Sequence, residues 1–118
     1  LIARENVIEG GLCAAAFVGV DGAEFSDNTI LFPQRWIFRM LQETTEPGFA
    51  PCRNVRVKGN RIVFRRGEIR SDVNIGGGTA PETFVFEENH WFAEDRPEAS
   101  KPQLPVEEAG GVYGTDPR

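Results

Sequence analysis

The segment VRVKGNRIVF, residues 55–64, contains a short pattern that recurs along the chain. One apolar residue, Val57, lies three positions before Asn60, and a second, Ile62, lies two positions after it. The segments AEFSDNTILF (23–32) and FVFEENHWFA (84–93) repeat the arrangement, and LIARENVIEG (1–10) is a weaker copy. The recurring residues are Asn6, Asn28, Asn60 and Asn89. Spacings in the twenties and low thirties indicate repeats that bury their apolar faces by stacking on one another.

Within one repeat, alternating apolar residues predict two strands around a corner. Val55 and Val57 lie on one face, residues 58–60 turn the chain, and Ile62 and Phe64 point inward again. Asn is suited to the corner because it tolerates left-handed backbone geometry and bonds nearby peptide groups. We expect the four Asn side chains to stack and to hydrogen-bond one another.

A third strand per repeat is predicted over residues 15–20, 36–42 and 70–75. The residues expected to face the core are Val18, Val20, Phe38, Met40, Val73 and Ile75. Those expected to face outward are Phe17, Ile37, Arg39, Arg70, Asp72 and Asn74. Three strands per turn predict an all-β parallel β-helix, a single-stranded solenoid of three to four coils over residues 1–92. An antiparallel sandwich of short strands is the alternative, but it would not need the same corner residue four times.

The last segment, residues 93–118, contains four prolines, which prevent regular strand pairing. We expect it to run extended and to pack on or after the last coil. The N-terminal repeat presents an uncovered edge, and exposed strand edges invite pairing with other chains. The chain begins at Leu1 without Met or a leader. It therefore reads as a mature product or a fragment, whose first coil is covered by missing N-terminal coils or by another chain.

Composition limits the class of protein. The chain has 118 residues with 40% hydrophobic content, 13 Gly and 8 Pro, which favours one domain of short strands and turns. A formal net charge of -5 argues against nucleic acid as a partner. No apolar run is long enough to predict a membrane span.

Few residues have the chemistry of a metal or redox site. Cys13 and Cys52 are too few for a disulfide framework, and either one bridge or two free thiols is compatible with their positions. His90 is the only His and is expected at the surface. We therefore expect no metal and no cofactor.

Three segments carry a family resemblance: NTILFPQRWIFRMLQET (28–44), NIGGGTAPETFVF (74–86) and LPVEEAGGVYGTDP (104–117). They resemble stretches of bacterial β-helix proteins, and residues 1–92 resemble the last coils of a right-handed parallel β-helix protein of the pectate-lyase-like superfamily. The resemblance implies an exported protein that binds polysaccharide along its third-strand sheet. It also implies an Arg or Lys base and a second cation that neutralises a uronate carboxylate, and Arg39 and Arg70 match these catalytic roles.

The outward face of the third-strand sheet is the candidate site. Residues 43–54 and 76–83 lengthen the loops beside it, and insertions on one face of a repeat protein often bind ligands. The residues expected to contact substrate are Arg35, Glu43, Asp72 and Asn74. The structural alternative is that Arg39 and Arg70 form surface ion pairs with Glu43 and Asp72.

Two functions remain open from the sequence. The first is binding of an extended polysaccharide, including one that contains uronic acid, with polysaccharide-lyase activity in the full-length chain. The second is a noncatalytic structural or assembly protein that displays loops and docks a partner.

Overall fold

The computed structural model describes residues 1–42 and 51–118 and contains almost only strands and turns. The prediction of an all-β protein is therefore confirmed. Two single-turn 3-10 helices, η1 (Pro81–Thr83) and η2 (Pro97–Ala99), complete the described secondary structure.

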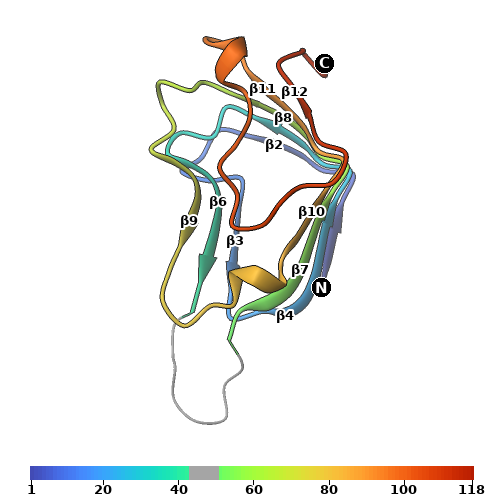
Figure 1. Ribbon diagram of the computed structural model, residues 1–118, viewed down its shortest axis with the longest axis vertical. Helices are drawn as coiled ribbons and strands as arrows, with labels where there is room; N and C mark the ends of the chain where they lie inside the picture. The colour runs from blue at the N-terminus through green and yellow to red at the C-terminus, as the bar shows by residue number, and fades with distance from the viewer. Residues whose placement is uncertain (43–50) are drawn as a thin grey trace.

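The strands form three parallel sheets around a shared core (Figure 1). The first sheet contains β1 (Ile2–Arg4), β4 (Asp21–Ser26), β7 (Arg53–Lys58) and β10 (Val85–Glu87). The second contains β2 (Val7–Glu9), β5 (Thr29–Leu31), β8 (Arg61–Phe64), β11 (His90–Ala93) and β12 (Val112–Tyr113). The third contains β3 (Ala15–Val18), β6 (Trp36–Leu41) and β9 (Ser71–Ile75). Consecutive strands up to β11 thus belong to different sheets, and each strand from β1 to β8 pairs with the strand three places later in the chain.

This arrangement corrects the sequence prediction of a single-stranded solenoid with three strands in every coil. The strands are divided among three separate sheets of four, five and three strands in a compact molecule. The radius of gyration is 13.7 Å, close to the value of about 13.5 Å for a globular domain of this length. The counts differ because the segment after β11 adds β12 to the second sheet and contributes no strand to the third. We therefore describe the fold as all-β, with three parallel sheets.

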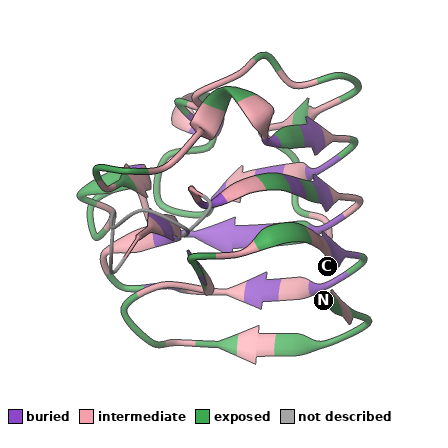
Figure 2. Cartoon of the chain, turned by 90° about the horizontal axis from the view of Figure 1, so that it is seen from below, coloured by how far each residue is buried: buried purple, intermediate pink, exposed green. Residues whose placement is uncertain are grey.

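The core lies between the three sheets and is rich in aromatic rings. Phe38 is fully buried, and its ring centroid lies 5.6 Å from that of Phe25 and 6.3 Å from that of Trp91, both in edge-to-face geometry. Such pairs are worth about 0.5–1.5 kcal/mol beyond their buried area. Strands near the N-terminal end are more exposed than those in the middle of the stack (Figure 2).

The inward and outward faces of the third sheet differ from the sequence prediction. Phe17, expected outside, is buried against Phe25, Phe38 and Phe84, while Val18, expected inside, is 38% exposed. The pairing of Phe17 with Met40 fixes this register, and a shift of one residue exchanges the two faces of a strand. Ile37, also expected outside, is fully buried in the core. Ile75 is 43% exposed, since β9 is the last strand of its sheet.

The four recurring Asn residues stack at the corner between the first and second sheets. The Nδ2 groups of Asn6, Asn28 and Asn60 donate to the Oδ1 atom of the next Asn along the chain, at 3.0, 3.1 and 2.9 Å. The same Oδ1 atoms also accept the backbone N–H of the preceding Asn. We call this row the Asn ladder. Asn28, Asn60 and Asn89 are fully buried, so the ladder satisfies polar groups that would otherwise be costly inside the protein.

The left-handed backbone at this corner belongs to the residue before each ladder Asn, and not to the Asn itself. These residues have φ values of 57°, 54°, 66° and 54° and are Glu5, Asp27, Gly59 and Glu88. A Cβ atom on Gly59 would lie 2.5 Å from Asp27 Oδ1. A larger residue at position 59 would therefore require the Asp27 side chain to move, whereas the same φ region is occupied by Glu or Asp at the other three corners.

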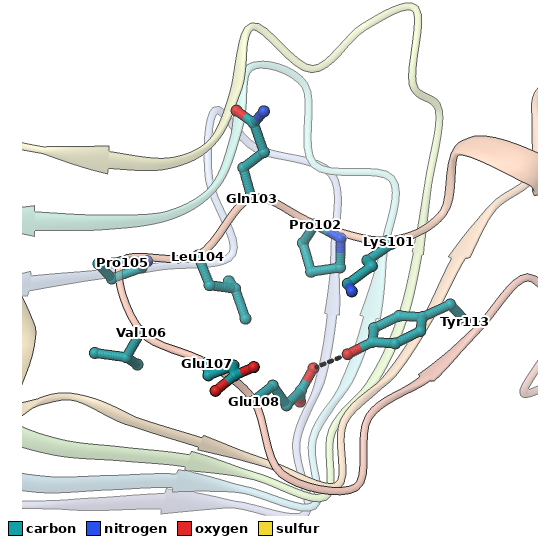
Figure 3. Close-up of a pocket in the computed structure, with 9 residues that line it drawn as sticks. All are labelled: Lys101, Pro102, Gln103, Leu104, Pro105, Val106, Glu107, Glu108 and Tyr113. Atoms are coloured by element: carbon teal, nitrogen blue, oxygen red, sulfur yellow. Dashed lines mark hydrogen bonds between the residues drawn. The ribbon is translucent and has the colours of Figure 1, made fainter.

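The C-terminal segment covers the end of the core that lies beyond β10 and β11 (Figure 1). Leu104, Val106 and Tyr113 pack against the core cluster, and Glu108 extends the Asn ladder. Glu108 Oε2 accepts from the backbone N–H and Nδ2 of Asn89, as a further Asn would. Glu108 Oε1 accepts from Trp91 Nε1. It also accepts from the Tyr113 hydroxyl (Figure 3). An ionised carboxylate has no N–H to donate, so the ladder ends at this residue.

Candidate functional site

The outer face of the third sheet presents one row of side chains across its three strands. Ala16 on β3 pairs with Arg39 on β6, which pairs with Asn74 on β9. Arg39 Nε donates a 3.0 Å hydrogen bond to Asn74 Oδ1. The amide of Asn74 therefore holds the guanidinium of Arg39 in one position on the face.

A half-buried aromatic ring lies beside this row. The Arg39 Cζ atom is 4.1 Å from the centroid of the Trp36 ring, and the Arg35 Cζ atom is 5.4 Å from it. Guanidinium groups at these distances are attracted to the π-system of indole. Arg39 is thus oriented by a hydrogen bond to its Nε and by contact with an aromatic ring.

Arg70 lies at the same end of the sheet. Its backbone N–H donates to the carbonyl of Arg35 at 2.7 Å, which places the two residues next to each other just before β6 and β9. Arg70 is exposed, whereas Arg35 and Arg39 are half-buried. Within residues 1–42 and 51–118, no carboxylate forms an ion pair with any of these three arginines. We call Arg35, Trp36, Arg39, Arg70 and Asn74 the arginine face.

Two of the residues expected to contact substrate are not part of the described arginine face. Asp72 is only 6% exposed and forms an ion pair with Arg66, not with Arg70. Its Oδ2 atom accepts the backbone N–H of Gln103 at 2.8 Å, so Asp72 anchors the C-terminal segment. Glu43 lies outside the described residues, as does most of the predicted loop 43–54.

An open pocket of about 380 Å³ adjoins Arg70. It is lined by Arg66, Ile69, Arg70, Ser71, Asp72, Ala99, Lys101 and Gln103. Arg66 is neutralised by Asp72, and its Nε donates to the carbonyl of Ala99. The cations of this pocket that have no carboxylate partner in the described part of the chain are Arg70 and Lys101.

A larger hollow of about 710 Å³ lies under the C-terminal segment, between residues 101–108 and Tyr113 (Figure 3). Its most prominent acid, Glu108, already accepts four hydrogen bonds from Asn89, Trp91 and Tyr113. Desolvation, with the nearby Glu108 carboxylate second, raises the pKa of Tyr113. We attribute this hollow to the packing of the segment over the core.

The remaining candidate groups lie elsewhere. His90 is on β11 of the second sheet, where its Nε2 atom lies 2.7 Å from the carbonyl oxygen of Thr115. Cys13 and Cys52 are free thiols. Burial raises the pKa of both, and the charge of Arg39 opposes this effect at Cys13. Cys52 Sγ donates to the carbonyl of Phe17 at 3.3 Å.

Residues 1–42 and 51–118 contain neither a metal-binding cluster of acids, His and Cys nor a membrane-spanning helix. No group of three or more His, Cys, Asp or Glu side chains there could hold a metal ion. No helix in that part of the chain is both long and apolar enough to cross a membrane.

No family model, curated protein or solved structure matches this chain. The resemblance to the pectate-lyase-like superfamily is therefore not supported, and the catalytic roles that it implied for Arg39 and Arg70 lose that basis. What remains is the geometry of the arginine face itself.

Sequence reasoning placed Arg35, Arg39, Arg70 and Asn74 on one face but missed two contributors. Trp36 was assigned only to a strand, although an aromatic residue between two arginines in RWIFR is a signal for stacking. Arg66 lies between β8 and β9, and nothing in its local sequence indicates that it reaches Asp72 and the C-terminal segment.

Proposed function

We propose that the arginine face binds an extended polysaccharide that carries carboxylate groups, such as a uronic-acid-containing glycan. The observation that carries this proposal is the group formed by Arg35, Arg39 and Arg70 around Trp36, with no carboxylate partner among the described residues. Such a cluster is unusual on a chain with a formal net charge of -5, and unneutralised guanidinium groups are suited to binding carboxylates.

Arg39 has the geometry of a prepared binding group. Its Nε donates a hydrogen bond to Asn74. No other described residue accepts a hydrogen bond from its two terminal nitrogens, which can form a bidentate pair with a carboxylate. The guanidinium is already held against Trp36, so little side-chain freedom is lost on binding. We assign Arg39 to a uronate carboxylate.

The other members of the face suit an elongated ligand. Arg70 lies beside Arg35 and opens onto the pocket that also contains Lys101, which provides a second cation farther along the surface. The Trp36 ring is half-buried and offers apolar area beside the cations, as the less polar face of a sugar ring requires. A glycan lying across the sheet would meet these groups in succession.

We assign the arginines to binding and not to proton abstraction. A guanidinium is a poor base at neutral pH, and His90 lies on another sheet. Lyase activity is tested separately, by following ultraviolet absorbance in the same mixtures, because a lyase forms an unsaturated product that absorbs ultraviolet light.

The test is calorimetric titration of the protein with oligogalacturonate and, in parallel, with its methyl-esterified form, which lacks the carboxylate charge. We expect binding of the acidic form only, weakened by about tenfold or more in Arg39→Gln, because a charge-assisted hydrogen bond contributes about 1.5–3 kcal/mol. Arg70→Gln should weaken binding as well.

Arg56→Gln is the matched control. Arg56 is an exposed arginine on β7 of the first sheet, and its side chain is 53% exposed. Equal losses for Arg56→Gln and Arg39→Gln would reveal unspecific charge attraction, and the absence of binding to any acidic glycan would refute the proposal. Growth of ultraviolet absorbance with the wild-type protein would add lyase activity.

A further inference from the structure

The open pocket beside Arg70 adjoins the arginine face and reaches the C-terminal segment. Its volume is about 380 Å³, and ligand-binding pockets usually measure about 300–1,000 Å³. Ile69, Arg70 and Ser71 line it at the start of β9, and Lys101 and Gln103 line it from the C-terminal segment. We call it the Arg70 pocket.

The two walls of the Arg70 pocket are held together by a buried carboxylate. Asp72 is 6% exposed, and its Oδ2 atom accepts the backbone N–H of Gln103 at 2.8 Å. Its Oδ1 atom accepts from Arg66, whose Nε donates to the Ala99 carbonyl at 3.0 Å. Both carboxylate oxygens of Asp72 are therefore engaged. The walls are fixed before a ligand arrives, so binding does not have to order them.

Three polar side chains at the pocket have no hydrogen-bonding or ionic partner among the described residues. They are the guanidinium of Arg70, the hydroxyl of Ser71 and the carboxamide of Gln103, and all three residues are exposed. Figure 3 shows the Gln103 carboxamide pointing away from Leu104 and from the hollow beneath the segment. A few polar groups of this kind orient a ligand in a pocket.

These groups match an acidic sugar residue. A guanidinium pairs with a carboxylate, and a hydroxyl and a carboxamide can each donate to and accept from sugar hydroxyl groups. The half-buried Ile69 adds apolar area to the same pocket. Asp72, the acid that lines it, is neutralised by Arg66, so the site remains suited to a negatively charged ligand.

We propose that the Arg70 pocket is a second subsite of the arginine face, which takes one uronic-acid residue of the same glycan chain. Arg70 binds the carboxylate of this residue, and Ser71 and Gln103 bind its hydroxyl groups. The proposal rests on the function proposed above, because it assigns the pocket to the glycan that Arg39 binds. It makes the C-terminal segment part of the binding site as well as a cover for the core.

The distance between the two subsites sets a minimum length for the glycan. Arg39 pairs with Asn74, which follows Arg70 by four residues. Four residues of extended chain span about 13 Å at about 3.3 Å per residue. We therefore expect a galacturonate disaccharide to occupy one subsite only and a hexasaccharide to reach both.

The test is an NMR titration of the full chain with the disaccharide and, separately, with the hexasaccharide. The Arg39 Nε–H and the Gln103 side-chain amide are the local readouts, because each belongs to one subsite. We expect the disaccharide to shift the Arg39 resonance only and the hexasaccharide to shift both.

Gln103→Ala is the variant that removes a contact of the second subsite alone. It keeps the backbone N–H that Asp72 accepts. We expect hexasaccharide binding to weaken about fivefold, as for the loss of one neutral hydrogen bond. Disaccharide binding should stay unchanged, which serves as the matched control for the folded state of the variant.

Failure of this proposal can be told apart from failure of the proposed function. A hexasaccharide that shifts the Arg39 Nε–H without the Gln103 amide would overturn the second subsite and leave the arginine face in place. Equal hexasaccharide affinity of Gln103→Ala and the wild type would do the same. No shift of the Arg39 Nε–H with either ligand would refute glycan binding at the arginine face, and the second subsite with it.

Discussion

The Glu108 carboxylate closes the Asn ladder by accepting hydrogen bonds from Asn89, at 2.8 Å from Nδ2 and 3.1 Å from the backbone nitrogen. A residue from a proline-rich segment thus takes the place that a fifth Asn would occupy. The ladder has a direction, since each Asn donates its backbone N–H and one Nδ2 hydrogen bond toward this end, and a negative charge is favourable where such dipoles terminate.

Replacing Glu108 by Ala should destabilise the protein by about 3 kcal/mol, because several buried donors lose a charged acceptor. Glu108→Gln keeps one acceptor oxygen and should cost only about 1 kcal/mol. Urea unfolding monitored by tryptophan fluorescence measures both values, since Trp91 contacts Glu108 directly. A Glu108→Ala variant as stable as the wild type would show that the cap has no energetic role.

The position of an Asn within the ladder should set the cost of removing it. Asn60 is fully buried, and its side chain both donates and accepts, so Asn60→Ala should cost roughly 3 kcal/mol or more. Asn6 is exposed and lies at the open end, so Asn6→Ala should cost about 1 kcal/mol. Chemical denaturation compares the two, and a larger loss for Asn6→Ala would contradict the ladder as described.

Asp95 should make stability depend on pH in the acid range. Hydrogen bonds from the backbone N–H of Gly67, and then of Arg66, hold the pKa of this exposed carboxyl below its ordinary value. A lowered pKa in the folded state stabilises the protein above the unfolded pKa of about 3.9, and this contribution is lost as pH falls through the folded value. The melting temperature of the wild type should therefore exceed that of Asp95→Asn at pH 6.

The same difference should shrink as the pH falls from about 4 through the lower folded pKa, below which the carboxyl is protonated in both states. Glu98→Gln serves as the comparison, because Glu98 is an exposed acid on η2. A difference between wild type and Asp95→Asn that stays constant from pH 6 down to pH 2 would be incompatible with these hydrogen bonds.

The two thiols should differ in reactivity. Cys13 is half-buried, whereas Cys52 is fully buried and donates to a backbone carbonyl. Burial raises the pKa of both, so each is a poor nucleophile near neutral pH, with Cys52 also shielded. Iodoacetamide should modify Cys13 slowly in the native protein and Cys52 only after unfolding, as mass spectrometry would show. Recovery of a peptide that links the two cysteines would refute the assignment of free thiols.

Much of the local pairing could be predicted from one sequence motif. The structure pairs Phe25 with Val57 and Ile30 with Ile62, which are the positions that share a place relative to the recurring Asn. An Asn at a buried corner must satisfy both its amide groups, so its recurrence marks equivalent places in successive strands. For the same reason the all-β class and several candidate residues, including Arg39 and Asn74, could be found without coordinates.

The tertiary structure alone decided how the strands divide into sheets, which face of β3 lies inside and where Asp72 points. The strand Ala15–Val18 is apolar on both faces, so its alternation does not distinguish inside from outside, and only the pairing of Phe17 with Met40 sets its register. Asp72 and Glu108 acquire their partners from segments 6 to 31 residues away. The sequence by itself therefore determined the repeating corner and the strands around it, because those depend on local geometry. Burial and charge pairing were decided by contacts that form only when distant segments fold together.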